Sequence, residues 1–114
     1  MPSATYELFL RAMREKKPVA CTYQGYQRVI CPAILGRTGL EEKSLVFQCA
    51  GGTSRGPVPP PGDWKCFALA EVRNAVLRDG AWQQDDPHSS HQNCMKMVEY
   101  DVNPDSPHDP AFRL

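Results

Sequence analysis

The sequence has no apolar run long enough to cross a bilayer, no net charge and no Cys-x-x-Cys pair. A membrane-spanning helix needs about 20 consecutive apolar residues, so we expect no membrane partner. With 13 basic and 13 acidic residues, no strong field draws the chain toward nucleic acid or an anionic surface. The missing Cys-x-x-Cys pair excludes a zinc ribbon and a thioredoxin-type motif. The N-terminus also lacks the basic and apolar segments of a secretory signal.

Signatures of catalysis are missing as well. No cysteine or histidine has neighbours that mark an activated nucleophile, and no pair of carboxylates has a spacing typical of an acid and a base. The Gly-rich segment 51–54 lacks both the Gly-Lys-Ser/Thr ending and the following helix of a phosphate-binding loop. We therefore expect a protein that is not an enzyme and carries no cofactor.

Cysteine is present in an odd number, at Cys21, Cys31, Cys49, Cys66 and Cys94. Four of the five lie in predicted strands among apolar neighbours, where a free cysteine packs as a small hydrophobic residue. This pattern favours reduced thiols and a cytoplasmic protein over a disulfide-linked scaffold.

The chain begins with a predicted helix over residues 3–17. Ser3 suits the N-cap, and Pro18 ends the helix because its ring cannot continue it. An apolar stripe follows the helical period: Leu8, Phe9, Ala12 and Met13. A stripe this narrow must pack on another element, and the sheet that follows is the expected partner.

Two strands, residues 19–24 and 26–35, flank a turn at Gln24-Gly25. Pro32 cannot donate to a strand ladder and so marks an edge or a bend. A second turn is expected to open at Gly36. Further strands are predicted over three segments: residues 44–50, 64–70 and 72–77, the last after a bend at Glu71.

The remaining segments are irregular in composition. Residues 51–63 form a Gly/Pro-rich loop, and from residue 83 the chain turns polar. Residues 94–102 alternate enough to predict a last strand that pairs with an edge of the sheet, and residues 103–114 predict a surface-draped or disordered tail. We therefore divide the chain into residues 1–82, a helix with a β-domain, and residues 83–114, a polar loop, strand and tail.

One helix followed by short strands and frequent turns predicts a mainly β (α+β) fold, a small barrel or sandwich with a helix outside it. The order of elements resembles the WYL domain, an SH3-like (Sm-like) β-barrel found mostly in bacterial transcription regulators. Its segments correspond here to LRAMREKKP (10–18), VACTYQG (19–25), RVICP (28–32), SLVFQCA (44–50) and CFALAEV (66–72). The Trp-Tyr-Leu triplet itself reads Leu45-Val46-Phe47, which is typical of a diverged, free-standing member.

The resemblance implies an SH3-like barrel of four to six strands whose polar and basic residues hold an anionic or nucleotide-like ligand. The residues that would form such a site are Tyr23, Arg28, Gln48, Arg55 and Lys65. Arginine offers a planar fork suited to phosphate or carboxylate, and a polar Gln48 within an apolar strand needs partners if it is buried. The alternative interpretation is a set of surface charges and a tyrosine hydroxyl bonded to the backbone. The leading hypothesis is a cytoplasmic, non-enzymatic ligand-binding or regulatory module.

Three alternatives stay open. A structural or protein-interaction barrel would pair through an exposed strand or the Pro-rich loop, for instance as a homodimer. A small metal-binding protein would use His88, His91 and Cys94, which are ligand types that zinc accepts. Binding of single-stranded nucleic acid would need aromatic side chains beside a basic groove, and three are available: Tyr26, Trp64 and Trp82.

Overall fold

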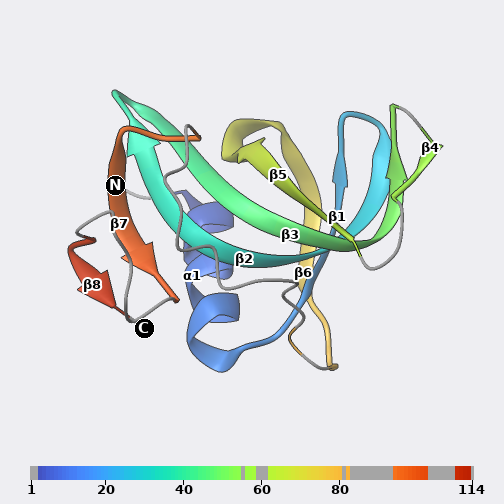
Figure 1. Ribbon diagram of the computed structural model, residues 1–114, viewed down its shortest axis with the longest axis horizontal. Coiled ribbons are helices and arrows are strands. Elements are labelled where there is room, and N and C mark those ends of the chain that lie inside the picture. Colours follow the sequence, from blue (N-terminus) through green and yellow to red (C-terminus); the bar gives the residue numbers. More distant parts are fainter. Residues whose placement is uncertain are drawn as a thin grey trace.

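A curled antiparallel sheet, with a single helix packed against it, forms the body of the protein (Figure 1). The structure is a computed structural model that describes residues 3–54, 56–58, 62–80, 82, 94–102 and 110–113. It shows a mainly β half-barrel with one N-terminal helix and a C-terminal strand, so the predicted fold class is confirmed. No helix in the described ranges is both long enough and apolar enough to cross a membrane.

The helix α1 spans Ala4–Glu15 and has the predicted caps. The Ser3 hydroxyl accepts a hydrogen bond from the backbone N–H of Tyr6 at 3.1 Å. At the other end, Lys16 adopts a left-handed conformation with φ of 54°, and the N–H of Lys17 returns to the carbonyl of Ala12. The helix therefore ends at Glu15, three residues before Pro18, which was predicted to end it.

Strands β1 (Val19–Tyr23) and β2 (Tyr26–Thr38) form the predicted hairpin. Both residues of its turn have positive φ, 54° at Gln24 and 81° at Gly25, as a tight two-residue hairpin turn requires. The second strand is longer than predicted and continues through Gly36. A Cβ at Gly36 would lie 2.0 Å from the carbonyl oxygen of Met97, so this glycine is needed for close packing. Of the turn predicted over residues 36–39, the first three residues are strand and only Gly39 turns.

Strand β3 (Glu41–Thr53) returns antiparallel to β2 after the true turn at Gly39, and it extends the predicted strand in both directions. The last residues of β3 are the first residues of the predicted Gly/Pro-rich loop. The short β4 (Gly56–Pro57) pairs with this end of β3. The sheet runs in the order β4-β3-β2-β1-β6, and β5 pairs with β3. The sheet is curled into a half-barrel.

Strand β5 (Asp63–Ala68) leads through a short 3-10 helix, Leu69–Glu71, into β6 (Val72–Leu77). The 3-10 helix is the bend that was predicted at Glu71, although it begins earlier and so shortens the preceding strand. Strand β6 pairs with β1, whereas β5 pairs with β3. The bend thus carries the chain from one end of the sheet to the other.

Pro32 lies where β2 changes its neighbour. Pairing with β1 ends at Ile30, and pairing with β7 (Met97–Asp101) begins at Ile34. The ladder between β2 and β3 also shifts register between Pro32 and Ile34. Because proline has no N–H to donate, it fits this break between two neighbours, and the predicted bend is confirmed.

The two faces of the sheet are covered differently. We call the face on which α1 packs the helix face and the opposite face the outer face. The helix face carries one continuous core of buried side chains: Tyr6, Phe9, Leu10, Ala12, Met13, Val19, Cys21, Tyr23, Ile30, Leu35, Val46, Phe67, Leu69 and Val72. The outer face carries a separate cluster of Ile34, Met95 and Val98, with Leu45 and Cys94 against it.

A disulfide joins Cys66 of β5 to Cys94, which contradicts the expectation that these two thiols are reduced. Cys66 is exposed on its strand, and the Cα atoms lie 5.4 Å apart, within the usual range for a disulfide. Cys21 and Cys31 are buried free thiols as predicted, and Cys49 is a partly buried free thiol. The disulfide fastens the start of the C-terminal segment to the outer face.

The predicted last strand exists as β7, and it adds to β2 beyond the end of β1. Within the predicted tail, β8 (Phe112–Arg113) pairs in parallel with β7, so this part is an ordered strand. Residues 83–93 and 103–109, which the sequence predicts to be a polar loop and the rest of the tail, lie outside the described residues.

Candidate functional site

Arg28 lies near the start of β2, two residues after the hairpin turn. It pairs with Cys21 of β1 on one side and with Gly51 of β3 on the other. Only 5% of Arg28 is exposed, which is unusual for a side chain whose charge is permanent. Its Nη1 donates a hydrogen bond to the Oε1 of Gln48 at 3.2 Å.

Three aromatic rings surround the guanidinium of Arg28. Its central carbon is 5.2 Å from the ring centre of Tyr23 and 5.6 Å from those of Tyr26 and Phe67. Tyr23 and Phe67 are stacked on each other with centres 3.9 Å apart. A cation within about 6 Å of an aromatic face is attracted by the ring quadrupole, so the rings partly replace the water that Arg28 has lost.

Gln48 is fully buried and holds its amide in a fixed orientation. Its Nε2 donates to the carbonyl oxygens of Ala50 and Gly52, both at 3.2 Å, which leaves Oε1 for Arg28. Every donor of the amide is therefore used within the protein. The neighbouring Gly51 has φ of 102° and no room for a side chain, because a Cβ would lie 2.2 Å from the carbonyl oxygen of Gln27.

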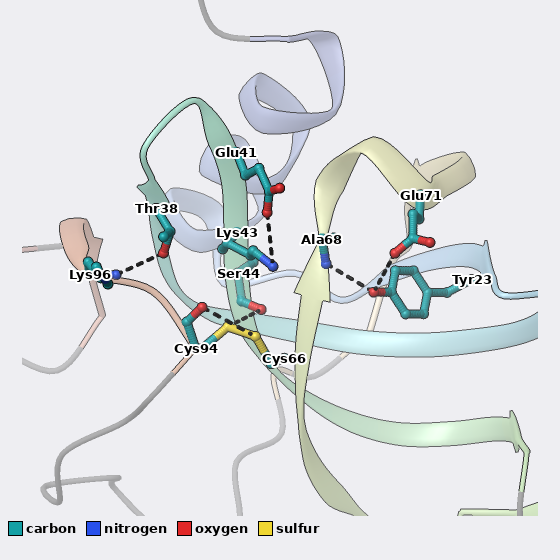
Figure 2. Close-up of polar contacts among 10 residues, drawn as sticks. All are labelled: Tyr23, Thr38, Glu41, Lys43, Ser44, Cys66, Ala68, Glu71, Cys94 and Lys96. Carbon is teal, nitrogen blue, oxygen red and sulfur yellow. Dashed lines mark hydrogen bonds and ion pairs between the residues drawn. A yellow bond between two sulfur atoms is a disulfide. The ribbon is translucent and has the colours of Figure 1, made fainter.

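The charge of Arg28 is not balanced by a nearby carboxylate. In the described parts of the chain no ion pair includes Arg28, and its Nε is buried without a hydrogen-bond partner. Glu71 accepts a hydrogen bond of 3.5 Å from the hydroxyl of Tyr23, and that hydroxyl accepts one of 3.0 Å from the N–H of Ala68 (Figure 2). The carboxylate of Glu71 thus contacts the phenol of Tyr23.

The structure brings together three of the five predicted site residues, Tyr23, Arg28 and Gln48. Lys65 lies on β5 opposite Val46, and its ammonium pairs with Asp63 at 3.4 Å. Arg55 lies outside the described residues. Phe67 was not predicted to belong to the site, and Tyr26 was predicted only as a stacking surface for nucleic acid.

The three aromatic residues considered for nucleic-acid binding have different surroundings. Tyr26 stacks over Arg28, whereas Trp64 packs edge-on against Phe47 at 5.3 Å. Trp82 lies 5.9 Å from the ammonium of Lys16, at the end of the helix. These contacts do not assemble them into one stacking platform beside a basic groove.

Among the described residues, two of the surface hollows are relevant to the site. The larger, of about 620 Å³, lies between the hairpin of β2 and β3, the start of α1 and the 3-10 helix, and both signs of charge line it: Ser3, Arg37, Leu40, Glu41, Glu42, Lys43, Ala68, Ala70 and Glu71. Figure 2 shows Glu41 and Lys43 paired there; their atoms are 3.4 Å apart. The smaller, of about 360 Å³, is lined by Ala20, Cys21, Thr22, Gln27, Arg28, Val29, Gly51, Asn74 and Arg78.

The smaller hollow belongs to the outer face. Strand alternation places Ala20, Thr22, Gln27 and Val29 on the side opposite to the one on which the guanidinium of Arg28 meets its rings. Arg28 and Cys21 also line the hollow, so it adjoins the Arg28 cluster across the same strands.

The proposed metal ligands do not form a site within the described residues. Cys94 is bonded to Cys66, and a cysteine in a disulfide has no thiolate to offer a metal (Figure 2). His88 and His91 lie outside the described residues. No group of three metal-ligating side chains occurs in the parts that the structure describes.

Burial raises the pKa of the Cys21 thiol to about 11, although the charge of Arg28 acts in the opposite direction. Cys21 is therefore a protonated, inert neighbour of the guanidinium at neutral pH. It offers Arg28 no compensating negative charge.

Comparison with known proteins identifies no relative: no family model, no curated protein and no solved structure matches the chain. The class that can be stated is a small β-rich domain with a half-barrel sheet and one N-terminal helix. Membership of the WYL family stays a prediction from the sequence.

Proposed function

We propose that this protein is a non-enzymatic binding module that takes an anionic group at Arg28. The observation that carries the proposal is a guanidinium with only 5% of its residue exposed, an unpartnered Nε and no ion pair among the described residues. Burying a charge without a counter-charge costs several kcal/mol, so such an arrangement is rare unless something compensates for it.

The hydrogen bond to Gln48 leaves the binding edge of the guanidinium unused by the protein. Gln48 accepts from Nη1, the terminal nitrogen on the same side as Cδ. The opposite edge, formed by Nε and Nη2, is the one that carboxylates and phosphates bind with two parallel hydrogen bonds. Gln48 and the aromatic rings thus hold the guanidinium in one orientation with that edge free at Nε.

Tyr26 supplies the route by which a ligand would enter. Its ring covers Arg28, yet 37% of the residue is exposed, and it rests against Gly52, where a Cβ would lie 3.2 Å from Cδ1 of Tyr26. Rotation of this one side chain would expose the guanidinium. A tyrosine beside an arginine also offers a stacking surface, which favours an anion attached to a planar group such as a nucleotide.

Thermal unfolding tests the proposal. We expect millimolar nucleoside phosphates, inorganic phosphate and dicarboxylates, screened one at a time, to identify an anion that raises the melting temperature, because a ligand present at 100 times its Kd stabilises the folded state by about 2.7 kcal/mol. Arg28→Met should abolish the shift. The variant also removes the donor to the buried Oε1 of Gln48, which by itself costs about 1–3 kcal/mol, so its melting temperature without ligand is the baseline for the comparison.

Lys65→Met is the matched control, because it removes one positive charge from a residue that is paired with Asp63. It should keep the ligand-induced shift. A shift of equal size in the Arg28 variant would show that binding occurs elsewhere, and a folded natural chain that responds to no anion would refute the proposal.

A second candidate is self-association through β6. In the described parts of the chain this strand pairs on one side only, with β1, and Val76 on it is 55% exposed. An open strand edge is a template for pairing with a second copy. Sedimentation of the natural chain and of Val76→Lys distinguishes the two: a dimer lost in the variant supports pairing, and a monomer at all concentrations refutes it.

A further inference from the structure

Cys31 and Cys49 form a pair of free thiols on adjacent strands. The ladder between β2 and β3 matches Val29 with Ala50 and Ile30 with Gln48, so Cys49 is an extra residue at a bulge. Cys31 follows directly on β2 and pairs with Phe47. The bulge therefore places Cys49 of β3 beside Ile30 of β2, and Cys31 is the next residue along β2.

The two thiols lie on adjacent strands, and their exposures differ. Cys31 is fully buried, whereas Cys49 is partly exposed and its Sγ lies 3.5 Å from the carbonyl oxygen of Val29. The hydrogen bond from Cys31 lowers the pKa of Cys49 to about 7, assisted by Arg78 and opposed by burial. At neutral pH a large fraction of Cys49 is therefore thiolate, the reactive form.

The smaller hollow lies next to this pair. Two of its lining residues are neighbours of Cys49. Val29 lies across from it on β2, and Gly51 is two residues further along β3. Arg78 and Asn74 also line it, and none of its nine lining residues is acidic. Its volume of about 360 Å³ is enough for a small organic molecule, and its charge suits one that carries carboxylates.

We propose that Cys49 and Cys31 are the attacking and resolving thiols of a reversible redox pair that reacts with anionic low-molecular-weight disulfides bound beside Arg78. The exposed thiol meets the substrate, and the buried thiol, in hydrogen-bond contact with it, completes the exchange. The exchange uses the thiols of Cys49 and Cys31 and the charge of Arg78, whereas the function proposed above uses the guanidinium of Arg28. Because Arg28 also lines the hollow, the two sites adjoin each other.

The exchange balances in two steps. The Cys49 thiolate attacks one sulfur of the substrate disulfide, whose S–S bond breaks; half of the substrate leaves as a thiolate and takes a proton from water. Cys31 then loses its proton and attacks the Cys49 sulfur of the mixed disulfide, and the second half leaves and accepts that proton. Two protein thiols are oxidised to a disulfide, and one substrate disulfide is reduced to two thiols.

The remaining cysteines are unsuited to this chemistry. Cys21 is buried, and its pKa is raised to about 11, so little thiolate forms. Cys66 and Cys94 are already bonded to each other. Their disulfide is also an internal reference, because peptide mapping distinguishes it from a new bond between Cys31 and Cys49.

The experiment treats the full chain at pH 7 with glutathione disulfide, a disulfide that carries carboxylates, and follows the products by intact mass and peptide mapping. We expect the natural chain to lose two hydrogen atoms and to show a Cys31–Cys49 bond, which thiols reverse. Cys31→Ser should instead accumulate glutathione on Cys49, because the resolving thiol is missing. Cys49→Ser should show neither product.

Two further variants test the details. Arg78→Gln should slow the reaction with glutathione disulfide several-fold but leave the reaction with the uncharged disulfide of 2-mercaptoethanol unchanged. Lys65→Met, which removes a positive charge from outside the hollow, is the control and should react like the natural chain. Circular dichroism of each variant establishes that it is folded.

Three results would overturn the inference. The first is a natural chain that stays unmodified while the Cys66–Cys94 bond is intact. The second is a mixed disulfide on Cys49 that persists with Cys31 present, and the third is an equal rate in the Cys49 variant. Cys49→Ser should keep the anion-induced thermal shift that depends on Arg28, so failure here is distinguishable from failure of the anion-binding proposal.

Discussion

The helix face and the outer face of the same sheet are closed by different means. On the helix face, α1 adds its apolar side to a continuous core of buried side chains from several strands. On the outer face, the described cluster is small, and the segment that covers it is fastened by a disulfide. A large apolar contact area stabilises a face without covalent help, whereas a small one needs a constraint on the chain.

The largest effect should follow from damage to the helix face. Phe9 of α1 is fully buried within that core. Phe9→Ala should lower the free energy of unfolding by about 3–5 kcal/mol, because it removes apolar contacts and leaves a cavity. Urea unfolding monitored by circular dichroism measures this value. Leu40→Ala, at a residue that is 97% exposed, is the control and should change stability by less than about 0.5 kcal/mol.

A smaller and more local effect is expected on the outer face. The double variant Cys66→Ser with Cys94→Ser opens a loop whose ends are 28 residues apart, and it should cost about 3 kcal/mol by the loop-entropy relation. Hydrogen exchange should rise in β7 while the amides of α1 stay protected at low denaturant. Equal loss of protection in both elements would show that the two faces unfold as one unit.

The smallest effect concerns the contact that joins helix and C-terminal strand. The hydroxyl of Tyr6 on α1 donates to the carboxylate of Glu99 on β7, which also pairs with Arg37 at 3.3 Å. Burial, and then Glu99, raise the pKa of Tyr6 above its ordinary value of 10.0. The folded state therefore holds the proton more tightly than the unfolded chain does.

The sign of the pH dependence follows from that shift. The contribution of Tyr6 to stability is complete below pH 10.0 and is lost as the pH rises through the higher pKa of the folded state. Tyr6→Phe should flatten the decline of the melting temperature above that pH relative to the natural chain. An unchanged slope in the variant would assign the decline to other groups.

Local chemistry explains why much of the fold was predictable. The cap at Ser3, the turn at Gln24-Gly25 and the bend before β6 depend on residues next to one another in the chain. In β1 the alternation along the strand is local as well: Val19, Cys21 and Tyr23 are buried, and the residues between them are only partly buried. Such features need no knowledge of distant segments.

What escaped prediction depends on distant partners. Gly36 was predicted to be a turn residue, but in the structure β7 packs against it. Cys66 was predicted to be a reduced core thiol, but in the structure it is bonded to Cys94. The candidate site shows the same division. Arg28 and Gln48 were chosen as polar residues within strands, but Phe67 joined them only because β5 packs across the helix face. No periodicity within its own strand marks Phe67 as a neighbour of a cation.

The change of neighbour at Pro32 also bears on the order in which the protein acquires its structure. The partners of β2 before Pro32 are close in sequence, whereas β7 beyond it must return from far along the chain. Local pairings form faster than those that close long loops. We therefore expect the hairpins to assemble first and β7 to dock late, so that the Cys66–Cys94 bond forms near the end and its appearance reports a completed fold.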